Sequence, residues 1–238
     1  MIFRRIAFVV LSVVWLSACS GVSQPDGNFH YATAAHIEII DMIAPPPMAG
    51  SSEDLADLAA VQTAQQYRTI AQIQSARADA ELSVFRFADV LGPKFSAQNL
   101  PATAALFVAL NHDLRPAIAA MKSHFARPRP YEIDSAIEPV VPKPGNDSYP
   151  SGHAAMAYAD AIILARLVPA RKSDIMARAR QYAQNRVIGG VHYPSDVEAG
   201  RVAAILYVKA LWGDAEFQCD FAAAKNEIHL KLPNPQRR

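Results

Sequence analysis

Cysteine is scarce in this sequence, since its 238 residues include only Cys19 and Cys219. By count alone, a zinc site built from Cys-x-x-Cys pairs is excluded. So is the dense disulfide framework that stabilises many small secreted domains. The fold must therefore rest on a hydrophobic core, and a hydrophobic content of 51% is enough to supply a sizeable one.

An excess of charge and a membrane-spanning run are absent as well. The 23 basic residues are balanced by 22 acidic ones, which leaves a net charge of +1, and no basic run is present. We therefore expect no nucleic-acid binding, which requires a basic surface. Beyond residue 18 no apolar run reaches the roughly 20 residues of a spanning helix, and Asp160 interrupts the apolar stretch after His153.

Glycine is infrequent, with 10 residues, and no stretch alternates apolar and polar residues over the length of a strand. Because alanine is abundant and the apolar residues recur at helical spacing, the sequence predicts an all-α protein, a single-domain helical bundle. We expect helices from a cap at Ser51 or Ser52, over 65–91, from a cap at Asn99 to Phe125 with a kink at Pro116, over 154–167, over 173–188, over 194–211 and over 215–230.

The first 18 residues are typical of a bacterial signal peptide. Arg4 and Arg5 precede an apolar run over 6–16 that is too short to span a bilayer. Leu16-Ser17-Ala18-Cys19 resembles the lipobox of bacterial lipoproteins, which implies cleavage before Cys19 and lipid on its thiol.

The residue after Cys19 is Ser20, which resembles the pattern of outer-membrane sorting. On this interpretation residues 1–18 are removed, residues 19–35 form a lipidated tether, and residues 36–238 form a domain on the periplasmic side. The lipid would be the only membrane attachment, and Cys219 would have no disulfide partner. An ordinary secreted protein cut nearby is the alternative.

The first of three chemically promising stretches runs from Lys122 to Pro130. Lys122 follows Ile118 by one helical turn, at the edge of an apolar stripe, so its ammonium can reach the interior at the helix end. Pro130 restricts the backbone of Arg129. A solvated basic helix end is the commoner meaning of such a cluster.

The second stretch surrounds Ser151, between a Pro- and Gly-containing loop at 140–147 and the apolar residues 154–167. We expect Ser151 to be the N-cap of a buried helix, with Gly152 and His153 in its first turn. The free N–H groups there favour an anion, and a histidine beside it can transfer a proton. A plain N-cap with an incidental His153 is the alternative.

The third stretch contains Arg186, His192 and Asp196. Arg186 continues the face of Ala179 and Tyr182, so it should point inward, and a buried guanidinium needs an anion. The spacing lets Asp196 accept the Nδ1 proton of His192, which leaves Nε2 free as a nucleophile. A hydrogen-bonded core histidine is the alternative.

Three cations, a helix N-terminus and two histidines have one common explanation, which is a phosphate. Lysine and arginine bind phosphoryl oxygens, and preorganised donors stabilise the charge that develops during phosphoryl transfer.

The motifs Lys122-x6-Arg129-Pro130, Pro150-Ser151-Gly152-His153 and Arg186-x5-His192-x3-Asp196 resemble the three-part signature of the type 2 phosphatidic acid phosphatase (PAP2) superfamily. This superfamily includes bacterial class A acid phosphatases, membrane lipid phosphatases and vanadium haloperoxidases. Residues 44–51 and 85–92 resemble the class A acid phosphatases, which extends the likeness over most of 40–212. Asn185 stands where the family usually has serine; an amide can also donate to phosphate, and the effect of this exchange on binding is left open.

The resemblance implies a metal-independent, cofactor-free acid phosphatase with the PAP2/haloperoxidase bundle fold. It would hydrolyse phosphorylated small molecules through a phosphohistidine, with phosphate transfer to other alcohols as an extension. His192 would attack phosphorus, Asp196 would orient it, and His153 would protonate the leaving alcohol. The groups that would hold the phosphoryl oxygens are Lys122, Arg129, Ser151, Gly152 and Arg186.

Other functions stay open at this point. A lipid-phosphate or pyrophosphate phosphatase and a vanadium-dependent haloperoxidase use the same signature, and an envelope protein with a relict anion site is the non-enzymatic alternative. A zinc hydrolase using His112, His124, His153 and His192 is disfavoured, because no helical histidine pair with a third ligand is visible. A homo-oligomer is also left open.

Overall fold

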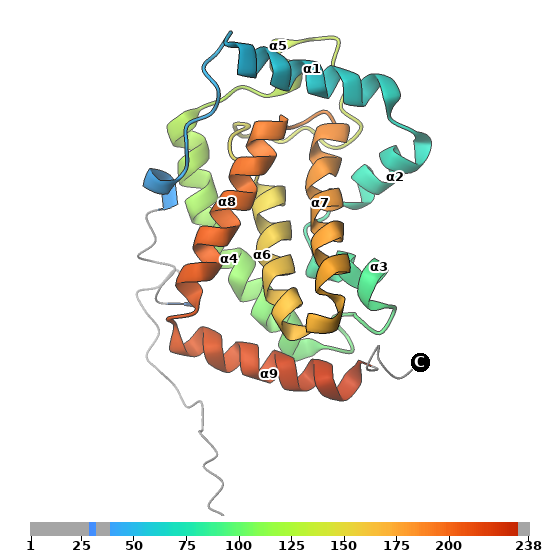
Figure 1. Cartoon of the computed structure of the whole chain (residues 1–238), viewed down its shortest axis with the longest axis vertical. Coiled ribbons are helices and arrows are strands. Elements are labelled where there is room, and N and C mark those ends of the chain that lie inside the picture. Colours follow the sequence, from blue (N-terminus) through green and yellow to red (C-terminus); the bar gives the residue numbers. More distant parts are fainter. Residues whose placement is uncertain (1–28, 32–38, 233–238) are drawn as a thin grey trace, which may run out of the picture.

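The computed structural model describes residues 29–31 and 39–232, and everything expected of residues 1–28, including lipidation of Cys19, lies outside this part. Helices α4 (Pro101–Phe125), α6 (Gly152–Leu167), α7 (Lys172–Ile188) and α8 (Pro194–Leu211) stand side by side (Figure 1). Helix α1 (Ser52–Tyr67) crosses one end of this bundle, and α9 (Ala215–Lys231) crosses the other.

Three short α-helices and three 3₁₀ turns complete the described residues. They are α2 (Ile70–Ala78), α3 (Ala88–Leu91), α5 (Pro130–Ile133) and the 3₁₀ turns Ile39–Met42, Val84–Phe87 and Pro169–Arg171. Every regular element in the described ranges is helical, which confirms the all-α prediction.

Helix α6 lies in the middle of the bundle because it is apolar on every side, and most of its side chains are buried. Helix α8 packs closely against its start. A Cβ atom added to Gly200 of α8 would lie 2.5 Å from the carbonyl oxygen of Ser151, so only glycine allows this approach. The contact holds the first turns of α6 and α8 together.

Asp160, the one acidic residue in α6, is buried in the core and accepts a hydrogen bond from the Asn111 amide at 3.0 Å. Burial raises the pKa of this carboxyl well above its usual value. Burial therefore favours the uncharged form of this side chain in the core.

Helix α4 has the predicted apolar stripe, with Pro116 inside the helix. Its N-terminus differs from the prediction, because Leu100 occupies the cap position instead of Asn99. The carboxylate of Glu227 in α9 accepts from the backbone N–H groups of Ala102 and Thr103, at 3.2 and 2.8 Å. A residue more than a hundred positions away thus caps this helix.

The expectation of one helical stretch over 65–91 is wrong. The chain breaks at Arg68, and Thr69 begins α2 by a capping box with Gln72. Helix α2 ends before Asp79, which is fully buried. Two Arg178 guanidinium nitrogens donate to Asp79, at 2.6 and 2.9 Å. These contacts hold the segment after α2 against α7.

Cys219 lies in α9, and the expectation that it has no partner is wrong, because none of the described cysteines is free. Within the described ranges, none of the helices combines the length and the apolar character that crossing a membrane demands.

Candidate active site

The three predicted stretches meet at the end of the bundle that α1 crosses (Figure 1). Helix α4 ends there, α6 begins, α7 ends and α8 begins. The side chains from these four termini share one electrostatic environment, because Lys122, Arg129 and Arg186 each lower the pKa of both His153 and His192. The structure therefore brings the predicted cations and histidines together.

His192 and Asp196 form the predicted pair, with 3.0 Å between Nδ1 and Oδ2 and both side chains buried. Oδ2 of Asp196 also accepts from Ser148 Oγ at 2.5 Å and from the N–H of Tyr193 at 3.0 Å. Its other oxygen, Oδ1, accepts from Arg127 Nη1 at 2.9 Å. A carboxylate held at both oxygens fixes the imidazole tautomer with hydrogen on Nδ1 and a lone pair on Nε2.

The Nε2 atom of His192 is not free, which corrects the sequence-based expectation. Arg129 Nη1 lies 3.0 Å from it. The other donors of Arg129 reach the Asn146 main-chain and side-chain oxygens, both at 2.8 Å, and the carbonyls of Asp147 (3.0 Å) and Val191 (2.7 Å). A guanidinium that is 1% exposed needs these acceptors, and the imidazole is one of them.

Lys122 reaches the interior as predicted. Its ammonium donates to the carbonyls of Asp147, at 2.5 Å, and Ser148, at 3.0 Å. Burial lowers the pKa of Lys122 to about 7, and the nearby Arg129 adds to this effect. A bound anion would restore the charged form.

Arg186 is the exception among these cations. Its side chain is 2% exposed, and two of its nitrogens, Nε and Nη1, are buried without a hydrogen-bond partner among the described residues. Burial lowers its pKa to about 10. Unpaired buried donors on a charged group are costly, so this guanidinium is the cation of the cluster with donors available to an external anion.

His153 follows the cap of α6, and its Nε2 lies 3.0 Å from the carbonyl oxygen of Ala80. Burial lowers the pKa of His153 to about 3, and the charges of Arg186, Arg129 and Lys122 add to the shift. Burial likewise places the pKa of His192 well below its usual value. An anion among the three cations would offset their repulsion and raise both values.

Ser151 is the N-cap of α6, as predicted. Its Oγ accepts from the N–H of Ala154 at 3.3 Å, and its own N–H donates to the Asp196 carbonyl at 2.9 Å. Gly152 is the first helical residue, and a Cβ there would lie 3.3 Å from Ile118. The serine thus ties the start of α6 to that of α8.

Asn185, whose effect the sequence leaves open, is bound on the side away from the cationic cluster. Its amide nitrogen donates to Ser75 Oγ at 2.9 Å and Asp79 Oδ2 at 2.8 Å, while its amide oxygen accepts from Gln181 at 2.9 Å. The buried carboxylate of Asp79 provides a stronger acceptor than the neighbouring site does, so the amide turns toward α2.

Sequence reasoning missed Arg127 and Ser148, both of which contact Asp196. It also missed Asp57 of α1, which binds Arg127 Nη2 at 2.9 Å. Arg127 has one local signal, its place two residues before Arg129 in the Arg-Pro-Arg-Pro motif. Ser148 and Asp57 carry no such signal, because their partners are distant in sequence.

The four histidines considered for a zinc site do not gather. His112 lies against His30, and His124 against Phe125, whereas His153 and His192 belong to the cationic cluster. Among the described residues no three His, Cys, Asp or Glu side chains are placed to hold a metal ion.

Two solved structures share this fold. One is a bacterial vanadium-dependent iodoperoxidase, with a TM-score of 0.55, 19% identity and coverage of 71% of this chain and 53% of that chain. The chain therefore spans about half of the iodoperoxidase. The other is a transmembrane PAP2-type phosphatidylglycerolphosphate phosphatase from Bacillus subtilis, with a TM-score of 0.53, 19% identity and coverage of 76% and 89%. The fold class is thus the PAP2/haloperoxidase bundle.

Sequence comparisons give the family. The PAP2 superfamily model matches residues 99–218. An acid phosphatase of Zymomonas mobilis subsp. mobilis is 30% identical over 221 residues, covering 90% of this chain and 82% of that protein. Non-specific acid phosphatases of Providencia stuartii and Salmonella typhi are 28% and 31% identical, covering 94% and 66% of this chain and 98% and 67% of theirs. The chain belongs to the PAP2 superfamily.

Proposed function

We propose that the protein is an acid phosphatase that hydrolyses phosphate monoesters through a phosphohistidine, and that it also transfers phosphate to other alcohols. The observation that carries this proposal is Arg186, whose buried guanidinium lacks partners at Nε and Nη1 beside two histidines. A phosphoryl group supplies the missing acceptors, and the relatives named acid phosphatase agree with this chemistry.

In the first step the Nε2 lone pair of His192 attacks phosphorus, so that a P–N bond forms and the ester P–O bond breaks. His153 gives its proton to the departing alkoxide, which leaves as an alcohol. In this step Asp196 stabilises the positive charge that develops on the His192 ring. An acceptor oxygen from the substrate takes the place of Nε2 as a partner of Arg129.

In the second step a water attacks the phosphohistidine. The water gives a proton to His153, the P–N bond breaks, and phosphate leaves, which returns both histidines to their starting states. Attack by a second alcohol in place of water gives phosphate transfer. The bound phosphoryl group also raises the pKa of His153, which allows His153 to act as an acid.

The phosphoryl oxygens are held by Lys122, Arg129, Arg186, the Ser151 hydroxyl and the Gly152 N–H. Together they supply the charge stabilisation that a metal ion provides in other phosphatases. Vanadate adopts the trigonal-bipyramidal shape of the transition state and should bind more tightly than phosphate.

The test is hydrolysis of nitrophenyl phosphate by the purified protein. We expect activity that survives EDTA and is inhibited by vanadate. Loss of activity in EDTA that zinc or magnesium restores would contradict the metal-free mechanism. Bromide or iodide oxidation with added vanadate and peroxide, in the absence of phosphatase activity, would assign the protein to the haloperoxidases instead.

For the N-terminus we propose removal of residues 1–18, lipid on Cys19, a tether over 19–35 and a domain over 36–238 at the periplasmic side of the outer membrane. The support is the lipobox-like sequence ending at Cys19. Cys219 is not free, and Cys19 is the one other cysteine of the sequence, so a disulfide between the two is the competing fate of the Cys19 thiol and would replace the lipid.

Labelling with a radioactive fatty acid distinguishes the two fates. We expect label in the wild type and none in Cys19→Ala. The wild type could instead carry no label and change its gel mobility on reduction, while Cys219→Ala does not change. That result would show that Cys19 forms a disulfide with Cys219 and is not lipidated.

A further inference from the structure

Arg127 occupies a position between α1 and the proposed catalytic pair that the family signature does not include. Its side chain is 6% exposed, and its guanidinium is bound on both sides. Nη1 donates to Asp196 Oδ1 at 2.9 Å and Ser195 Oγ at 2.7 Å. Nη2 donates to Asp54 at 2.8 Å and Asp57 at 2.9 Å. One cation therefore joins three carboxylates from two helices.

The backbone presents Arg127 in this direction because α4 ends in an unusual turn. Ala126 has a left-handed conformation with φ of 45°, and its N–H bonds to the Lys122 carbonyl. The carbonyl of Arg127 then accepts from the N–H of Ser148 at 2.8 Å, and the Ser148 hydroxyl holds the other oxygen of Asp196. Backbone and side chain of Arg127 thus converge on the same carboxylate.

The far side of the arginine is anchored as firmly as the near side. Asp57 accepts from the Ser195 N–H at 3.2 Å and from the Ser195 hydroxyl, and Ser195 lies next to Asp196. The guanidinium carbon also lies 3.8 Å from the centroid of the Tyr193 ring. Rotation of Asp196 away from His192 would therefore break contacts to α1 as well.

We propose that Arg127 is a positioning residue that holds Asp196 in its hydrogen bond to His192 and keeps it ionised during turnover. The proposal rests on the proposed function of His192 and Asp196. Without Arg127, a carboxylate that is buried would lose its main counter-charge, and its acid form would replace the anion that stabilises the His192 ring.

The direction of the pH effect follows from the charges around Asp196. Burial raises the pKa of Asp196, and Arg127 is the largest influence that opposes this. Removal of Arg127 should raise that pKa further, so the acidic limb of kcat should move to higher pH. The titratable and charged groups facing this pair are His192, Lys122, Arg129, Tyr149, Tyr193, Asp54 and Asp57.

The experiment compares Arg127→Met and Arg127→Lys with Arg68→Met. Arg68 is a matched control, because it donates only to the carbonyls of Ile188 and Glu138 at the same end of the bundle. We expect Arg127→Met to lose roughly a hundredfold in kcat with little change in KM, and its acidic limb to shift upward. Arg127→Lys should recover much of the rate and return the limb toward the wild-type pH.

A folded Arg127→Met enzyme with a lower kcat and an unshifted acidic limb would overturn the proposal. So would an equal loss in Arg68→Met, since that would make the effect one of general structure. If His192→Ala retained activity while Arg127→Met showed its limb shift, the proposed function would fail separately from this inference.

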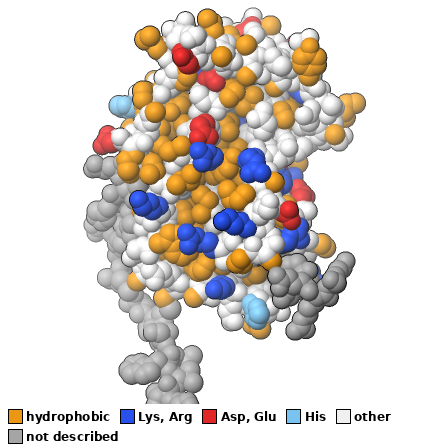
Figure 2. Space-filling view, in the orientation of Figure 1, with side chains coloured by type: hydrophobic (Ala, Val, Ile, Leu, Met, Phe, Trp, Pro, Cys, Tyr) orange, Lys and Arg blue, Asp and Glu red, His pale blue; other side chains and the backbone are white. Residues whose placement is uncertain are grey.

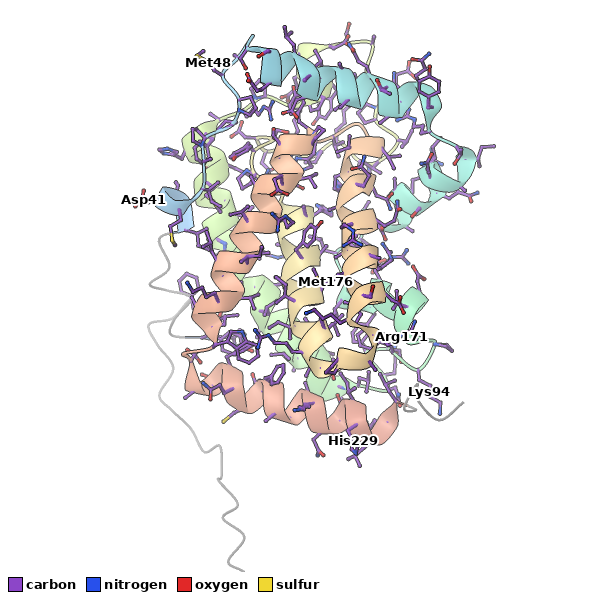
Figure 3. All side chains as sticks on the ribbon, in the orientation of Figure 1. Asp41, Met48, Lys94, Arg171, Met176 and His229 are labelled. Carbon is purple, nitrogen blue, oxygen red and sulfur yellow. The ribbon has the colours of Figure 1, made fainter. Side chains whose placement is uncertain are left out.

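A second inference comes from the opposite end of the molecule. A groove of about 570 Å³ lies between α6, α7 and α8, on the face shown in Figure 2. Its apolar lining includes Ile162, Met176, Val208 and Trp212, and Met176 is labelled in Figure 3. Figure 2 shows lysine and arginine side chains gathered around this apolar area.

The cations at the groove are Arg166, Lys172 and Lys209, with Arg180 next to them. All four are exposed, and none forms an ion pair within the described residues. The Arg166 guanidinium lies 4.5 Å from the Trp212 ring centroid. The long side chains of these exposed cations can reach the anionic headgroups of a bilayer, while the aromatic and aliphatic side chains of the groove contact the outer acyl carbons.

From this charge complementarity we infer that the groove face docks on an anionic lipid surface. The candidate active site lies at the other end of the bundle, so docking leaves it open to solvent. A protein partner would need acidic side chains in fixed positions, whereas the mobile charges of a bilayer suit exposed cations that no carboxylate holds in place within the described residues.

Trp212 reports directly on this contact, because Trp15 is the only other tryptophan. In a Trp15→Phe/Cys19→Ala background, which leaves Trp212 as the one tryptophan and carries no lipid, we expect vesicles containing phosphatidylglycerol to shift Trp212 emission to the blue, and phosphatidylcholine vesicles to leave it unchanged. Lys172→Glu/Lys209→Glu should weaken binding at least about tenfold with unchanged phosphatase activity. The exposed pair Lys94→Glu/Arg115→Glu changes the charge equally and should bind as before.

Equal responses to both vesicle types, or equal weakening by both double variants, would overturn this inference. The inference would also be overturned if the protein self-associates and Trp212 then no longer responds to vesicles, because the groove face would bind a second copy of the chain.

Discussion

Arg178 and Arg186 lie two turns apart on α7 and are both buried, but their surroundings differ. Arg178 donates two hydrogen bonds to Asp79, at 2.6 and 2.9 Å, and a further one to Asp89 at 3.2 Å. Within the described residues Arg186 forms no ion pair, and its Nε and Nη1 atoms have no hydrogen-bond partner. The described chain therefore supplies carboxylates to Arg178, and the proposed function assigns the unpaired donors of Arg186 to a ligand.

The two environments also treat nearby polar groups differently. Burial opposes ionisation of Asp79, but the hydrogen bonds and charge of Arg178 more than offset it, so the pKa of Asp79 lies below its usual value. Around Arg186 burial and like charges act together, and the pKa values of Lys122 and His153 fall to about 7 and about 3. The first cluster is complete within the chain, whereas the second would be completed by the phosphoryl anion of the proposed function.

The largest effect on activity should come from replacing His192, which lies in the cluster around Arg186. His192→Ala removes the nucleophile, so we expect kcat to fall at least about 10⁴-fold for every substrate. His112→Ala, which replaces an exposed histidine outside both clusters, is the control and should leave kcat unchanged. Phosphate trapped by rapid quench on His153 in place of His192 would reverse the assignment.

His153 lies between the two clusters, since its Nε2 contacts the carbonyl of Ala80, next to Asp79. As general acid it should matter most for poor leaving groups. We expect His153→Ala to lose about 10²–10⁴-fold with sugar phosphates.

With nitrophenyl phosphate the first step of His153→Ala should be partly spared, because nitrophenolate leaves largely unaided. Rapid-quench kinetics should then show a burst of nitrophenol and accumulated phosphoenzyme. An equal loss of kcat with good and poor leaving groups would contradict the role of His153 as general acid.

Arg178→Met tests the complete cluster. The change leaves Asp79 buried with weaker partners, so we expect a loss of about 3–5 kcal/mol in the free energy of unfolding. Arg186→Met should be neutral or stabilising, because an apolar side chain of similar length replaces unpaired donors. Denaturant unfolding of both variants measures the change in the free energy of unfolding. An equal loss in both would contradict the claim that Arg178 is paired within the chain and Arg186 is not.

A smaller effect should appear in the number of protons that the protein takes up when it binds an anion. At pH 8 Lys122, with its pKa of about 7, is largely neutral, and a bound anion raises that pKa. Titration calorimetry with sulfate in buffers of different ionisation enthalpy should show uptake of roughly one proton or less per site. Lys122→Met should abolish the uptake, and uptake that persists in this variant would assign it to another group.

The bundle was largely predictable because its signals are local. The apolar stripe of α4, the Ser151 cap of α6 and the bounds of α8 each follow from residues within a few turns of one another. The break between α1 and α2 was missed because the helical composition of 65–91 outweighed the local capping box of Thr69 and Gln72. The end of α2 was missed because it is fixed by Asp79 pairing with Arg178, 99 residues away.

The site divides in the same way. The four-residue spacing of His192 and Asp196 predicts their hydrogen bond, and the helical face predicts the burial of Arg186. The role of Asn185 could not be predicted because its acceptor, Asp79, comes from a distant segment. Arg127 escaped notice for the same reason, since its anchors Asp54 and Asp57 lie on α1.

The central claim is that an anion completes Arg186, and thermal unfolding with and without vanadate tests it most directly. Vanadate at a hundred times its dissociation constant should stabilise the wild type by about 2.7 kcal/mol. We predict that Arg178→Met, although less stable, shows the same vanadate-induced rise in Tm, whereas Arg186→Met loses most of it. A full rise in Arg186→Met would contradict the account.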